Sequence, residues 1–179
     1  MKIPVLDHTK NLWVMYPGLK AYLPNIYKLD AEIENPSSKD RGSRIGWSLI
    51  YLLHPDSDFF NTPREEAMKY ISKDIMNESP TSEGWDFVFQ VASKFKEGLL
   101  TPAGRAILDW KIKFEERAQF LESVPYDENT FEMLDKMLSN TKKMFDMLRQ
   151  AQADYSKEKA EEHTEGGAVE SLSDKGDLG

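Results

Sequence analysis

The sequence predicts an all-α fold: a compact multi-helix body, an irregular N-terminal segment rich in aromatic residues and proline, a long C-terminal helix and a polar tail. Apolar residues recur at spacings of three and four along most of the chain, which is the period of an amphipathic helix. No stretch shows the sustained apolar alternation of β-strands. Serine and Thr-Pro signals precede the periodic stretches and indicate where helices begin.

The composition fits one ordinary domain with an appendage. The chain has 179 residues, of which 40% are hydrophobic. It has no cysteine, which excludes disulfides, thiolate zinc sites and a cysteine nucleophile. No run of about 18 apolar residues and no signal peptide are found, so we expect the protein to stay where it is made.

The net charge of −8 is concentrated towards the C-terminus. From Ser156 onward, seven acidic residues stand against three lysines, so half of the net negative charge falls there. The charge of the body argues against a surface that binds phosphate throughout, and leaves room for a local basic patch.

Residues 1–36 are expected to form an irregular segment that packs on the body. Prolines at this density break any long helix. The segment mixes these prolines with aromatic residues and a glycine: Trp13, Tyr16, Pro17, Gly18, Tyr22, Pro24, Tyr27 and Pro36.

Residues 37–127 are expected to form the helical body. Ser37 and Ser38 are predicted N-caps of a buried helix that ends at His54, before Pro55. The apolar residues of this helix are Ile45, Trp47, Leu49, Ile50, Leu52 and Leu53.

A second body helix is predicted from its start signal, with Thr62 as N-cap, Pro63 at the first helical position and Glu65 at the third. Residues 77–80 end it.

Two further helices complete the body. Ser82 is the predicted cap of the most apolar one, and Gly98 lies where a C-terminal glycine belongs. Thr101-Pro102 starts the next helix, which Pro125 ends. The buried face of this last body helix is predicted to contain Ile107, Trp110, Phe114 and Leu121.

The final helix is predicted over residues 128–162, with Asp127 as its cap and residues 163–179 as a flexible tail. Its heptad seam is predicted to contain Phe131, Leu134, Leu138, Phe145, Leu148 and Tyr155, with polar residues Thr141 and Gln152 at two sites and Met137 and Met144 beside it. The helix would be roughly 50 Å long, more than a small core can cover.

We therefore expect the first part of the helix, residues 131–138, to belong to the core, and the outer part to bind a partner. The predicted partner-binding residues are Met144, Leu148, Tyr155, Val169, Leu172 and Leu178.

The sequence predicts no catalytic residues, no metal site and no cofactor. His54, Asp56 and Asp58 have suitable chemistry for a divalent metal, but further ligands have no obvious source, and a polar loop between helices is the favoured interpretation. Neither a nucleophile elbow nor a nucleotide-binding loop is present. A metal-dependent hydrolase that uses these three residues remains one alternative.

Nucleic-acid binding is a second alternative. Lys39, Arg41 and Arg44 form a small basic group next to Trp47, as contact with DNA or RNA requires. Three charges fall short of a full footprint, and Asp40 lies among them.

Three segments resemble small all-helical proteins encoded among the assembly and DNA-packaging genes of large tailed bacteriophages. They are residues 54–71, residues 108–144 with Glu115-Glu116-Arg117 and Val124-Pro125-Tyr126, and the Gly-Gly tail that ends near Ser173-Asp174-Lys175-Gly176. The resemblance implies a non-enzymatic structural protein of the virion or its assembly, which binds other protein subunits and can form an oligomer. It would act in the host cytoplasm or in the virion. The resemblance also implies the alternative of a DNA-packaging protein similar to a terminase small subunit, although a basic recognition helix near the N-terminus is missing.

Overall fold

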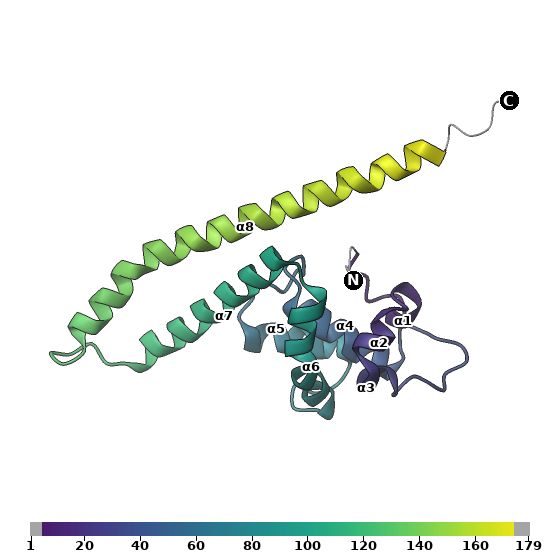
Figure 1. Ribbon diagram of the computed structural model, residues 1–179. Helices are drawn as coiled ribbons and strands as arrows, with labels where there is room; N and C mark the ends of the chain where they lie inside the picture. The colour runs from purple at the N-terminus through teal and green to yellow at the C-terminus, as the bar shows by residue number, and fades with distance from the viewer. Residues whose placement is uncertain (1–4, 174–179) are drawn as a thin grey trace. The chain divides into compact units, whose positions relative to one another are not determined.

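The protein is built from helices (Figure 1). The computed structural model describes residues 5–173, and describes side chains from residue 5 to residue 161. These residues form eight α-helices and one π-helical turn, with no strand among them, which confirms the all-α prediction. The helices are α1 (Leu12–Met15), α2 (Leu19–Tyr22), α3 (Pro24–Tyr27), α4 (Arg41–Leu53), α5 (Arg64–Ile71), α6 (Glu83–Leu99), α7 (Pro102–Ser123) and α8 (Phe131–Ser173), and the π-turn η1 is Ser72–Met76.

The chain divides into two compact units. Unit 1 is Met1–Leu100 and unit 2 is Thr101–Gly179. This division differs from the expected one, which placed residues 37–127 in a single body and began the C-terminal helix as a separate part at residue 128. The difference arises because α7 packs along α8 and shares its heptad spacing.

Unit 1 is organised around α4. This helix has 13 residues, and all but three of them are buried. It packs against α1, α3, α5, α6 and η1. A helix with so many buried residues is stable only when neighbours surround it, so the core of unit 1 lies along α4. The largest side chains in this core are Trp47 and, from α6, Trp85 and Phe95.

A buried aspartate joins the N-terminal segment to the start of α4. Asp30 accepts hydrogen bonds from the backbone N–H of Gly42 at 2.8 Å and of Ser43 at 2.6 Å, and from Trp13 Nε1 at 2.8 Å. It thus satisfies N–H groups that the first turn of a helix leaves without a partner. The segment is not irregular throughout, because it contains the short helices α1, α2 and α3.

The cap of α4 differs from the prediction. Ser37 and Ser38 were expected as N-caps, but the helix begins at Arg41 with Asp40 as its N-cap residue. The Asp40 carboxylate makes no cap hydrogen bond, and instead accepts from Ser37 N at 2.7 Å and from Asn11 Nδ2 at 3.0 Å. The capping role passes to Asp30 for this reason.

The second and third body helices start close to their predicted positions. Pro63 is the N-cap residue of α5 rather than its first helical residue, because its ψ of 140° is extended. The helix widens into η1, and the residue that follows this turn, Asn77, has a left-handed φ of 55°. Ser82 precedes α6 as predicted, although its side chain makes no cap hydrogen bond.

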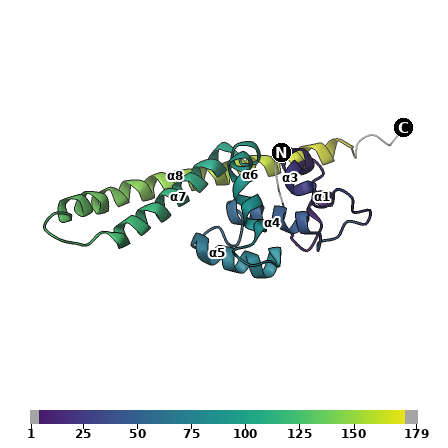
Figure 2. The same cartoon turned by 90° about the horizontal axis from the view of Figure 1, so that it is seen from below.

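Unit 2 is an antiparallel hairpin of α7 and α8, which lie side by side in Figures 1 and 2. Thr101 accepts a hydrogen bond from Gly104 N at 3.1 Å, as its predicted capping role requires. The final helix begins at Phe131, later than predicted, because Asp127 Oδ1 accepts from the N–H of Asn129 at 2.8 Å and so closes a turn before the helix. The helix continues to Ser173, into the segment predicted as a tail.

Candidate protein-interaction surface

One row of α8 side chains faces α7. Its members are spaced alternately by three and four residues, and all of them are buried or half-buried: Leu134, Met137, Thr141, Met144, Leu148, Ala151, Tyr155 and Glu158. The matching row on α7 has the same spacing and contains Ala103, Ile107, Trp110, Phe114, Arg117 and Leu121. We call the contact between the two rows the hairpin seam. This spacing is typical of coiled-coil packing.

The middle of the hairpin seam is polar. Arg117 Nη2 donates to Thr141 Oγ1 at 3.3 Å, and Arg117 Nη1 lies 3.2 Å from the sulfur of Met144. The Nε of Arg117 is buried and has no hydrogen-bond partner among the described residues. An arginine with these neutral neighbours weakens the packing at this level of the hairpin.

The hairpin seam differs from the predicted one in half of its members. Leu138, Phe145 and Gln152 were expected in it, but Met137, Met144 and Ala151 take the corresponding positions. Two adjacent rows of α8 are apolar, and one partner helix covers only one of them. The second row contains Phe131, Leu138 and Phe145, whose side chains are 42%, 55% and 49% exposed.

This second row and its charged neighbours form a face that we call the α8 outer face: Phe131, Asp135, Leu138, Lys142, Phe145 and Arg149. Phe145 rests on one side against Phe114 of α7, with ring centroids 5.0 Å apart. All six side chains of the face are exposed. Asp135, Lys142 and Arg149 make no ion pair with any other described residue.

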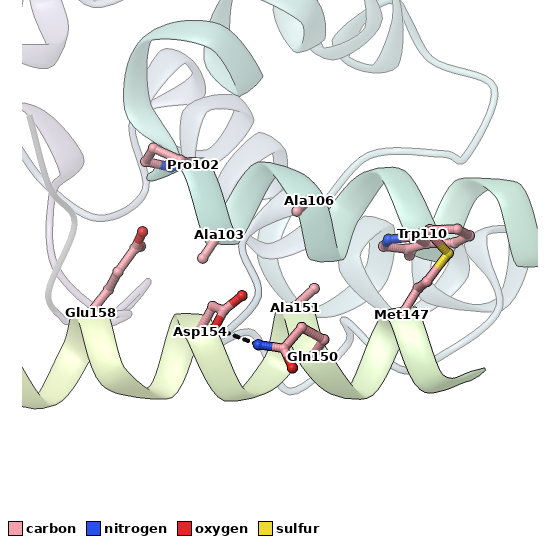
Figure 3. A pocket seen from close by; sticks show the side chains of 9 residues that line it. All are labelled: Pro102, Ala103, Ala106, Trp110, Met147, Gln150, Ala151, Asp154 and Glu158. Atoms are coloured by element: carbon pink, nitrogen blue, oxygen red, sulfur yellow. Dashed lines mark hydrogen bonds between the residues drawn. The ribbon is translucent and has the colours of Figure 1, made fainter. Parts of the chain in front are cut away.

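A shallow groove of about 440 Å³ lies on the opposite edge of the hairpin (Figure 3). Small side chains at Ala103, Ala106 and Ala151 leave space between the helices, and Trp110 and Met147 close one end. Pro102, Gln150, Asp154 and Glu158 complete its lining. Glu158 Oε2 is buried and has no hydrogen-bond partner in the part of the chain that the structure describes. The groove is therefore apolar at the end that Trp110 and Met147 close, and acidic towards the end where α7 begins.

The predicted partner-binding residues fall into two groups. Met144, Leu148 and Tyr155 belong to the row that faces α7. The side chains of Val169 and Leu172 lie outside the described part of the structure, and so does the whole of Leu178. Partner binding by these six residues stays a prediction.

The predicted basic group is partly engaged within unit 1. Arg41 Nε donates to Glu78 Oε1 at 2.7 Å, and Arg41 Nη2 lies 3.9 Å from Glu83 Oε2. The hydrogen bond from Arg41 is the main cause that lowers the pKa of Glu78. Lys39 is exposed, and the Nε of Arg44 is buried without a hydrogen-bond partner in the described residues. Only part of the predicted positive charge thus faces solvent unpaired.

The His54 loop has a structural role. His54 is 7% exposed, and its Nδ1 accepts a hydrogen bond from Asp56 N at 3.2 Å. Ser57 Oγ donates to the carbonyl of Tyr51 at 2.5 Å, which holds the loop against the end of α4. Among the described residues, no three histidine or acidic side chains come together as a metal would need.

Comparison with known proteins does not assign this chain to a family. Protein-family models, curated proteins and solved structures were searched, and none of them matches this chain. As for membranes, the helices in the described part of the chain include none that combines the length and the apolar character needed to cross a bilayer. The resemblance to phage assembly proteins therefore stays an expectation.

The α8 outer face is the feature of this surface that the heptad pattern did not predict. A signal for it exists, because Met137, Met144 and Ala151 can take the places of Leu138, Phe145 and Gln152 in a seam with the same spacing, and Ala151 then replaces a polar residue. A second apolar row is then left over.

Proposed function

We propose that this chain is a non-enzymatic assembly protein that binds another protein subunit through the C-terminal part of α8. The observation that carries the proposal is the unequal length of the two hairpin helices. The helix α7 has 22 residues and α8 has 43. Pro102 at the start of α7 and Glu158 of α8 line the same groove, so α8 continues from there to Ser173 without a second helix of unit 2 beside it.

A single helix of this kind gains little stability from itself. The extension continues an existing helix and so needs no nucleation, but each residue that it adds contributes little net stability in water. Packing against another surface is the usual source of helix stability in proteins. A helical extension beyond the hairpin therefore supports a role in binding a partner.

The charge of the extension indicates the character of that partner. From Glu158 to Ser173 the sequence contains five glutamates and one lysine. A surface with lysine and arginine would complement it, and attraction between the two would speed their encounter. We therefore propose a protein partner with a basic docking surface.

The setting of the proposal is the assembly of a tailed bacteriophage particle. It rests on the resemblance of residues 54–71 and 108–144, and it places the protein in the host cytoplasm during assembly, and in the virion if the protein remains bound. DNA packaging remains the alternative, and the ion pair of Arg41 with Glu78 lowers the positive charge that it would use.

The proposal is tested by tagging the chain in the organism or phage that encodes it and measuring which proteins co-purify in a fixed ratio. We expect one basic subunit to co-purify with the intact chain, and to be lost when residues 162–179 are deleted. The charge-reversed variant Glu161→Lys/Glu162→Lys should weaken this association, whereas Glu32→Lys/Glu34→Lys in unit 1, a control with the same change of charge, should not.

The same purification separates the two parts of the proposal. Equal recovery of the subunit with the truncated chain would remove α8 from the binding site. Absence of the chain from purified particles and from their assembly intermediates, measured by mass spectrometry, would contradict the phage setting.

A further inference from the structure

The α8 outer face has a repeating arrangement of apolar side chains. Phe131, Leu138 and Phe145 are spaced by seven residues, so they follow one line along the helix. Each is about half exposed, although residues of this size gain most from burial. Leu138 lies midway between the two phenylalanines. The row is therefore symmetric about Leu138, with one phenylalanine seven residues before it and one seven residues after it.

The charged residues of this face are not symmetric about Leu138, because their sign changes there. Asp135 lies towards the start of the helix, and Lys142 and Arg149 lie beyond its middle. All three are exposed, and they make no ion pair among the described residues. One half of the face is thus acidic and the other half is basic.

We infer that the α8 outer face binds the same face of a second copy of this chain, with the two α8 helices antiparallel and a two-fold axis near Leu138. Leu138 then packs on Leu138 of the second copy, and Phe131 packs on the second copy's Phe145. Asp135 comes level with the second copy's Lys142. The two-fold axis repeats this contact, so two ion pairs form, and each copy contributes one aspartate and one lysine. Arg149 comes level with the acidic loop that precedes the other α8.

The charges favour this arrangement over a parallel one. In a parallel pair, Asp135 would lie beside Asp135 and Lys142 beside Lys142, and like charges at such positions are repulsive. A two-fold interface places the same surface on both sides, so that surface must complement itself. The α8 outer face meets this requirement in its apolar row and in its charges.

This dimer does not rest on the proposed function. It uses the N-terminal half of α8 and needs only the chain itself, whereas the proposed partner binds the C-terminal part. From Phe131 to Arg149 the face is about 27 Å long. An interface of this length is small, and we expect a dissociation constant of about 10 µM.

The first test is the mass of the purified full-length chain, measured by size-exclusion chromatography with light scattering. At about 100 µM we expect a dimer for the native chain, and a monomer for Leu138→Glu, which weakens the dimer about a hundredfold or more. Met133→Glu is the matched control, because Met133 is an exposed apolar residue on the other edge of α8. It should remain a dimer. A monomeric native chain, or a dimer that persists in Leu138→Glu, overturns the inference.

The second test reads the direction of the pairing. Because the chain has no cysteine, single cysteines report contacts without interference. Under oxidation Leu138→Cys should form a covalent dimer and Phe131→Cys alone should not, whereas a mixture of Phe131→Cys and Phe145→Cys should cross-link. Efficient cross-linking of Phe131→Cys with itself would show a parallel pair and overturn the antiparallel arrangement.

Charge reversal gives an independent reading of the same register. Asp135→Lys and Lys142→Glu should each weaken the dimer about tenfold, since each change creates two repulsive pairs. A mixture of the two variants should form a heterodimer with the native affinity, because the reversed charges then face each other. Failure of the mixture to restore the dimer contradicts the pairing of Asp135 with Lys142.

Discussion

In unit 1 the central helix is enclosed by its neighbours, whereas in unit 2 the helix α8 packs on α7 along a single row. The helix α4 is buried on all sides and its first turn is held by Asp30. In the helix α8, the side chain of Leu134 is buried, whereas those of Leu138 and Phe145 are about half exposed. The helices α4 and α8 are both amphipathic. They differ in the number of helices that pack against each of them within its own unit. Unit 1 buries most of its central helix, whereas unit 2 leaves a row of apolar side chains of α8 half exposed.

The largest expected effect tests the enclosed core of unit 1. Trp47→Ala should lower the free energy of unfolding by about 3–5 kcal/mol, because it removes a fully buried ring and leaves a cavity. It also removes the hydrogen bond from Trp47 Nε1 to the Lys10 carbonyl. Urea denaturation followed by circular dichroism measures the change. Phe120→Ala in unit 2 is the control, and a loss as large as that of Trp47→Ala would contradict the comparison.

The next effect concerns the hydrogen bonds by which Asp30 connects the N-terminal segment to α4. Asp30→Ala should cost about 2–3 kcal/mol, because it leaves the N–H groups of Gly42, Ser43 and Trp13 without their acceptor. Thermal unfolding measures this loss. Glu32→Ala, an exposed acid two residues away, should change stability by less than about 0.5 kcal/mol. Similar values for the two variants would show that Asp30 does not join the segment to α4.

A change of opposite sign is expected in the hairpin seam. Arg117→Met should raise the stability of the hairpin by about 1 kcal/mol, because a charge with only neutral partners is replaced by an apolar side chain of similar length. Chemical denaturation of the full chain measures it, and Lys113→Met, on the edge of the same helix, is the matched control. A destabilised Arg117→Met variant would mean that the arginine makes a net favourable contact.

The smallest effect is a dependence on pH at the edge of unit 1. Arg41 lowers the pKa of Glu78, so the pair adds stability above the unfolded pKa of Glu78, and this stability is lost as the pH falls through the folded pKa. Because Arg41 is partly exposed, we expect less than about 1 kcal/mol. Unfolding curves between about pH 6 and about pH 3 should show Glu78→Gln losing stability at the higher pH only. An equal difference at both ends of this range would exclude ionisation of Glu78 as the cause.

The predictable parts of the fold are those determined by neighbours in sequence. Thr101 and Pro102 predict the start of α7 correctly, because a cap acts within one turn. The apolar spacing also predicts that α4 is a buried helix. The cap of α4 could not be predicted in the same way, because Asp30 reaches it from an earlier segment of the chain.

The candidate surface shows the same limit. The heptad pattern predicts that α8 packs on another helix, but two adjacent apolar rows satisfy that pattern almost equally. The choice between Leu138 and Met137 depends on how α7 lies against α8, and the spacing within α8 alone does not contain that information. For this reason Leu138 was predicted in the core and is found on the surface.

The position of Asp30 has a consequence for where this protein can be shortened. The first turn of α4 takes its cap from a residue ten or more positions earlier in the chain, so the N-terminal segment is part of the same cooperative unit as the core. A shortened protein that begins at residue 37 would expose the apolar face of α4 and leave its first N–H groups unsatisfied. A stable form of unit 1 must therefore begin before Asn11, which caps α1.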